Sequence, residues 1–86
     1  MSTSISKDVL AQELHDETVL LDLDSENYFG LDSVGTRIWQ LLNEGQDKSD
    51  MVDTLLGEYE VEREVLEKDI SELLGRLNEA GLIKIA

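Results

Sequence analysis

The sequence predicts a small α+β domain shaped like a winged helix-turn-helix, with strands in the first third of the chain and three helices after them. Two observations lead to this fold class. Before residue 32 the apolar residues alternate with polar ones in short runs, which is the period of a strand. After residue 33 they recur every three or four positions, which is the period of a helix.

The strand pattern is clearest over residues 18–31, where we expect a hairpin. Within it, residues 24–27 read DSEN, which is the composition of a turn. Residues 9–14 fit either an earlier strand or a helix. The alternation that predicts a strand with one buried face sets Val19, Leu21 and Leu23 against Leu20, Asp22 and Asp24.

Three helices are expected after the hairpin. The first begins at Ser33 and can end at Gly45, and the second begins after Asp47, an acidic form of the capping box. The third runs over residues 62–80 and stops at Gly81, and residues 82–85 extend as a short tail. The residues expected to face the core are Val34, Ile38, Leu41, Leu42, Val52, Leu55, Leu56, Tyr59, Leu66, Ile70, Leu73, Leu74 and Leu77.

The length of 86 residues predicts a single domain over 1–86, in which the small polar residues 1–7 fray. No apolar run reaches the roughly 18 residues that a membrane span needs. The start of the chain has no basic region followed by an apolar block, and there is no cysteine. We therefore expect a cytoplasmic protein without a membrane partner.

The charge is strongly acidic, with seven Lys and Arg against twenty Asp and Glu, a formal net charge of −13. Nucleic-acid binding requires a basic surface that neutralises phosphates. A chain this acidic is repelled by DNA and RNA, which argues against a transcription factor of winged-helix shape. The charge instead favours encounter with a basic or neutral partner.

Ser33 has two interpretations. It follows Asp32 at the start of an amphipathic helix, which is how an acyl carrier presents the serine that takes phosphopantetheine. In acyl carriers, however, a long helix precedes that serine, whereas a strand pattern precedes it here. We interpret Asp32 or Ser33 as a helix cap that accepts a backbone N–H. The acyl or peptidyl carrier, with phosphopantetheine on Ser33, is the alternative function.

Other catalytic or ligand-binding patterns are weak. The one histidine, His15, stands among charged residues and does not form a metal site by itself. No glycine pattern fits a phosphate-binding loop, and no nucleophile has a positioned base. We expect a protein that is not an enzyme and that has no cofactor or metal.

Two segments resemble a known family. Residues 28–42 read YFGLDSVGTRIWQLL, and a late helix with an internal aspartate, Asp69, ends in AGL at residues 80–82. Over residues 9–85 the chain resembles the PqqD-like proteins, which are recognition elements for ribosomally made, modified peptides. It is most similar to the small free-standing type found with lasso peptide biosynthesis.

The resemblance implies a three-stranded antiparallel sheet followed by three helices. It implies that the chain binds the leader of a precursor peptide, often with a Tyr-x-x-Pro pattern, which adds a strand to the third strand and packs against the third helix. The further partners that it implies are a leader peptidase, a transglutaminase-like cysteine protease, and an ATP-dependent macrolactam synthetase, the lasso cyclase.

An edge strand has unpaired N–H and C=O groups, so an extended peptide can complete its ladder. We expect Phe29 and Leu31 to point toward the core and Tyr28 to point to the other face of the strand. Leu73 fits plain core packing as well as peptide contact, and Arg76 also fits a surface role near a helix C-terminus. The candidate peptide-binding residues are Asn27, Tyr28, Phe29, Gly30, Leu31, Val65, Asp69, Leu73 and Arg76.

Overall fold

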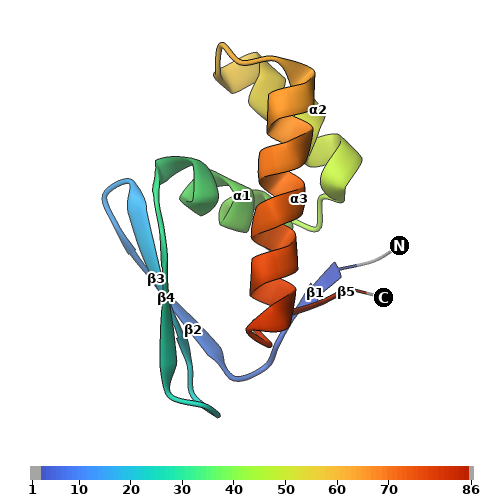
Figure 1. The fold of residues 1–86 in the computed structure, drawn as a ribbon. Coiled ribbons are helices and arrows are strands. Elements are labelled where there is room, and N and C mark those ends of the chain that lie inside the picture. The colour runs from blue at the N-terminus through green and yellow to red at the C-terminus, as the bar shows by residue number, and fades with distance from the viewer. Residues whose placement is uncertain (1–2, 86) are drawn as a thin grey trace.

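The structure is a computed structural model that describes residues 3–85. A three-stranded sheet comes first, three helices follow it, and two short strands near the ends of the chain pair with each other (Figure 1). In chain order the elements are β1 (Thr3–Ile5), β2 (Val9–Leu14), β3 (Glu17–Asp22), β4 (Asn27–Leu31), α1 (Ser33–Asn43), α2 (Lys48–Glu58), α3 (Arg63–Glu79) and β5 (Ile83–Ile85).

The main sheet has the order β2-β3-β4, and both pairs are antiparallel. This confirms the predicted α+β class with three antiparallel strands before three helices, and it assigns residues 9–14 to a strand. The β3–β4 turn is held by the carboxylate of Asp22, which accepts hydrogen bonds from the Asp24 backbone N–H at 3.1 Å and the Ser25 hydroxyl at 2.8 Å. Both β2 and β4 are edge strands of this sheet.

The alternation places the apolar residues Val19, Leu21 and Leu23 on one face of the sheet, but the structure buries the opposite face. Leu20 is fully buried, whereas Val19 and Leu21 are half-buried and Leu23 is exposed in the turn. The register explains this, because Leu20 lies opposite Phe29 and Thr18 lies opposite Leu31, and these four residues share the face toward the helices. Burying polar Thr18 is tolerated because its hydroxyl donates to that of Thr36 in α1 at 2.9 Å.

The start of the chain is also different from the prediction. Residues 3–5 do not fray but form β1, which pairs antiparallel with β5, Ser4 lying opposite Lys84. Ser6 continues the contact, since its backbone N–H donates to Leu82 O at 3.0 Å and its hydroxyl donates to Gly81 O at 2.7 Å. Residues 1 and 2 of the predicted frayed segment lie outside the described residues. Figure 1 shows β1 and β5 side by side.

Aspartates cap the starts of α1 and α2, and glycines follow the ends of α1 and α3. Asp32 is the cap of α1, because its carboxylate accepts the Gly35 backbone N–H at 2.8 Å, and Asp47 caps α2 in the same way. Gly45 and Gly81 follow α1 and α3 with positive φ angles of 85° and 77°, a conformation that favours glycine. The predicted helix boundaries are therefore close to those observed.

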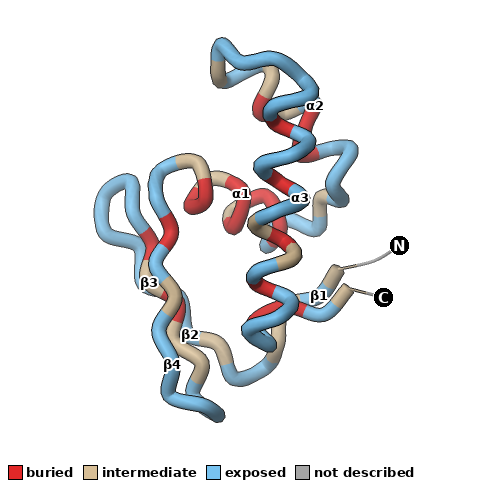
Figure 2. Tube along the Cα trace, viewed as in Figure 1, coloured by how far each residue is buried: buried red, intermediate tan, exposed pale blue. Residues whose placement is uncertain are grey.

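The core lies between the sheet and the helices and between the helices themselves (Figure 2). Trp39 is 2% exposed and belongs to the core, whereas Tyr59 packs against it half-buried. Within residues 3–85, no helix combines the length and apolar character required to cross a membrane. The buried core residues are Leu20, Leu31, Ile38, Trp39, Leu41, Leu42, Met51, Val52, Leu55, Leu66, Ile70, Leu74, Leu77, Leu82 and Ile83.

Candidate functional site

A groove of about 460 Å³ lies between β4 and α3, with the start of α1 at one end. β4 and α3 run alongside each other in Figure 1. The contact between the Arg76 guanidinium and the Phe29 ring joins the two elements. The residues that line the groove are Phe29, Gly30, Leu31, Asp32, Val34, Gly35, Ile38, Asp69, Glu72, Leu73 and Arg76.

The floor of the groove is apolar. Leu31 and Ile38 are buried in the core, while Phe29 and Leu73 are half-buried and keep part of their surface accessible. Gly35 lets α1 begin close to β4, because a Cβ on this residue would lie 3.3 Å from the Leu31 side chain. The short connection through Asp32 thus brings the helix start against the strand. The groove can accept apolar side chains on this floor.

The walls of the groove carry both signs of charge. The Arg76 guanidinium lies 5.1 Å from the centroid of the Phe29 ring, a cation–π contact. On the same helix, Glu72 precedes Arg76 by one turn and Asp69 precedes it by two. At the other side Asp32 uses one carboxylate oxygen to cap α1. The groove therefore has one cation among three carboxylates.

The backbone of β4 forms one wall of the groove. In the described part of the chain, β4 pairs with β3 on one side and has no strand on the other. Its outward N–H and C=O groups can complete a ladder with an extended chain laid along this edge. The same position places the side chains of such a chain against α3.

Six of the nine candidate peptide-binding residues line the groove, namely Phe29, Gly30, Leu31, Asp69, Leu73 and Arg76. Asn27 lies at the start of β4 outside the lining. Tyr28 points to the outer face of the sheet and is 73% exposed. Val65 is also exposed and lies one turn before Asp69, beyond the end of the groove.

Five residues that line the groove are not among the nine predicted peptide-binding residues. Asp32, Val34, Gly35 and Ile38 come from the start of α1, and Glu72 comes from α3. The motif of residues 28–42 contains the first four. Because the strand in this motif is followed directly by a helix, the start of that helix has to lie beside the strand, and this could have identified them. Helical spacing places Glu72 on the same flank as Asp69 and Arg76.

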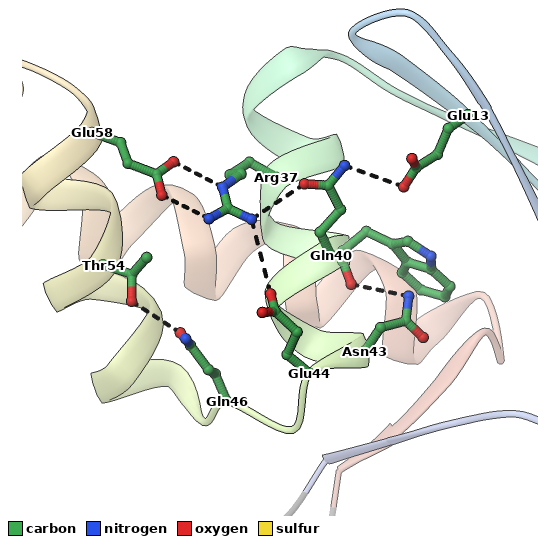
Figure 3. Close-up of polar contacts among 9 residues, drawn as sticks. Glu13, Arg37, Gln40, Asn43, Glu44, Gln46, Thr54 and Glu58 are labelled. Carbon is green, nitrogen blue, oxygen red and sulfur yellow. Dashed lines mark hydrogen bonds and ion pairs between the residues drawn. The ribbon is translucent and has the colours of Figure 1, made fainter.

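A second hollow of about 340 Å³ lies on the other side of α1, and Ser33, Arg37 and Tyr59 are among its lining residues. Here the guanidinium of Arg37 donates to both carboxylate oxygens of Glu58, at 2.8 and 2.7 Å, and to Gln40 at 3.2 Å (Figure 3). The hydrogen bonds between Arg37 and Glu58 raise the pKa of the guanidinium and lower the pKa of the carboxylate. The cation of this hollow is therefore engaged by the protein itself.

The chain is similar to known proteins in sequence and in fold. Residues 17–83 match the family described as Coenzyme PQQ synthesis protein D (PqqD). A solved structure described as "TbiB1 in Complex with the TbiA(beta) Leader Peptide" is 41% identical, with a TM-score of 0.91, and the match covers 96% of each chain. "Lasso peptide synthetase B1 complexed with the leader peptide" is 30% identical, with a TM-score of 0.90, covering 99% of this chain and 100% of that one. A search of curated proteins gave no match.

Proposed function

The chain belongs to the PqqD family, and from this premise we propose that it binds the leader region of a ribosomally synthesised precursor peptide of the lasso type, without catalysing a reaction. The leader adds a strand to β4 and packs its inward side chains against α3. The observation that carries the proposal is the edge of β4, which pairs with no further strand among residues 3–85 and lies beside a groove with an apolar floor and a wall formed by α3.

Two relatives of nearly the same length as this chain support the assignment, since both are described as complexes with a leader peptide. The physics of the edge also supports it. Each backbone hydrogen bond contributes about 0.5–1.5 kcal/mol, so the ladder provides affinity without sequence preference. Selectivity then comes from the floor, where a Tyr or Pro side chain of a Tyr-x-x-Pro leader fits beside Phe29 and Leu73.

A protein that binds the leader without modifying it can deliver the precursor peptide to the enzymes that do. The resemblance to free-standing lasso proteins points to two recipients, the cysteine peptidase that removes the leader and the ATP-dependent macrolactam synthetase. The acidic charge of −13 favours peptides and enzymes with basic or neutral surfaces over nucleic acids. The carrier alternative finds no support, because Ser33 follows a strand and the cap bond comes from Asp32.

The test is a titration of the isotope-labelled chain with the synthetic TbiA(beta) leader peptide, followed through backbone amide shifts. We expect the shifts to concentrate on residues 27–31 and 65–76. Residues 9–14, in the opposite edge strand β2, serve as an internal control because they offer a similar unpaired edge without the groove. Shifts centred on β2, or no binding at all, would contradict the proposal.

A further inference from the structure

The groove contains the cation of Arg76, which forms no ion pair with another side chain among residues 3–85. Arg37 and Arg63 each form an ion pair with a carboxylate at 2.7 Å. Among residues 3–85, Arg76 has no ion pair, although Glu72 stands four residues before it on the same helix, the spacing that usually joins such pairs. The chain has twenty Asp and Glu, and yet within the part that the structure describes Arg76 is the arginine without an ion pair.

The position of Arg76 follows from its contact with Phe29. The guanidinium lies over the ring at 5.1 Å, so its plane is held at the groove while its N–H donors stay free for another acceptor. Phe29 belongs to the strand that receives the guest. A side chain of the guest that enters the groove beside Phe29 therefore meets a fork of donors, and a carboxylate matches that fork in charge and in geometry.

The neighbouring carboxylates make this position selective. A ladder of backbone hydrogen bonds does not by itself define the register of an added strand. A slip of one residue turns the guest's inward side chains outward, and a slip of two moves each by about 6.8 Å. The rise between Arg76 and Glu72 along α3 is about 6 Å. A carboxylate that slips two residues in that direction leaves the cation and comes beside Glu72, and a longer slip in the same direction carries it toward Asp69.

We propose that Arg76 is a specificity-determining residue that binds an Asp or Glu side chain of the guest peptide and, with Glu72 and Asp69 opposing the slipped positions, sets the register of the added strand. This inference rests on the proposed function and names what the same groove recognises. Apolar contacts on the floor select which side chains of the leader fit, and the charges set the register of the added strand. The guest thus carries an acidic residue at one groove-facing position.

The first experiment is calorimetric titration with the synthetic TbiA(beta) leader peptide and with versions in which each Asp or Glu is replaced in turn by Asn or Gln. We expect one replacement to weaken binding by about 10-fold or more. Arg76→Gln should weaken the unmodified peptide by a similar factor, and combining the two changes should add little. Arg63→Gln is the matched control, since it removes the same charge from α3 outside the groove.

The second experiment moves the charges. Arg76→Glu combined with Glu72→Arg leaves the net charge unchanged and shifts the cation by one turn of α3. This variant should lose affinity for the unmodified peptide and recover it for a peptide whose critical acidic residue is moved by two positions.

The outcomes distinguish a failure of the inference about Arg76 from a failure of the proposed function. Two results would overturn this inference and leave the proposed function standing. In the first, the wild-type chain binds the peptide but Arg76→Gln weakens binding no more than Arg63→Gln does. In the second, the fold-losses of affinity from Arg76→Gln and from the acidic replacement in the peptide multiply when the two changes are combined. If the wild-type chain binds neither this peptide nor the leader of the 30% identical relative, the proposed function fails and the inference fails with it.

Discussion

The two hollows on either side of α1 each contain an arginine, and the two arginines differ in what holds them. Arg37 donates to both oxygens of Glu58 and lies 3.9 Å from Glu44, so it ties α1 to α2 (Figure 3). Arg76 faces the ring of Phe29 and has no carboxylate partner among residues 3–85. The first cation joins two helices, and the second is the one that we propose recognises the guest peptide.

The difference extends to the surroundings. The hollow beside Arg37 is lined mainly by polar groups, including Thr36, whose hydroxyl already bonds Thr18. The groove beside Arg76 has an apolar floor and borders the unpaired edge of β4. Hollows of comparable volume therefore have different capacities for binding, because binding depends on groups that are not already paired within the protein.

The largest effect is expected from a charge placed on the groove floor. Leu73→Asp should weaken binding of the TbiA(beta) leader peptide by about 100-fold or more, because a carboxylate replaces half-buried apolar surface on the floor of the groove. Val61→Asp adds the same charge at an exposed position outside the groove and should leave binding nearly unchanged. Calorimetry measures both. Equal losses in the two variants would show that net charge, rather than the groove, controls binding.

On the other side of α1, the bond between Thr18 and Thr36 should matter for stability and not for binding. Thr18→Val should lower the free energy of unfolding by about 2 kcal/mol, because it leaves the buried Thr36 hydroxyl without its partner. Replacing both threonines by valine should cost less than the single change. Urea denaturation gives these values, and a double variant that is less stable than the single one would contradict this account.

Asp32 and Ser33 are adjacent but line different hollows, which gives a direct comparison. Asp32→Ala should cost about 1 kcal/mol of stability through loss of the cap bond to Gly35. Ser33→Ala should change stability by less than about 0.5 kcal/mol, as expected for a surface position. Thermal unfolding distinguishes them. A mass gain on Ser33 after incubation with coenzyme A and a phosphopantetheinyl transferase would contradict its assignment as a non-modified residue.

The smallest effect concerns the ion pair of Arg37. Glu58→Gln should lower the free energy of unfolding by about 0.5 kcal/mol at neutral pH, a modest value because both side chains keep about a third of their surface exposed. The hydrogen bond from Arg37 lowers the pKa of Glu58 below its ordinary 4.5. The contribution is therefore complete above pH 4.5 and is lost as the pH falls through the lowered value. Denaturation curves of the two proteins should converge in acid, and a constant difference down to pH 2 would exclude this pair as the cause.

Much of the fold was predictable because it depends on local signals. The starts of α1 and α2 followed from aspartates in capping positions, and the ends of α1 and α3 followed from glycines that adopt positive φ. β1 was missed because its partner strand, β5, lies about 80 residues away, and short polar segments carry little signal of their own. The buried face of β3 was reversed because the pattern treats Thr18 as polar, although Thr36 satisfies its hydroxyl.

By itself the sequence determined the order and boundaries of the helices, the β3–β4 hairpin and the acidic charge, because periodicity, capping residues and composition are properties of neighbouring residues. Tertiary structure decided which edge of the sheet lies beside α3, which of the arginines is paired, and that the start of α1 closes the groove. These depend on distances between segments far apart in the chain. The sequence alone does not distinguish Arg37 from Arg76. Their surroundings differ because Glu58 lies beside Arg37 and Phe29 lies beside Arg76 in the folded chain.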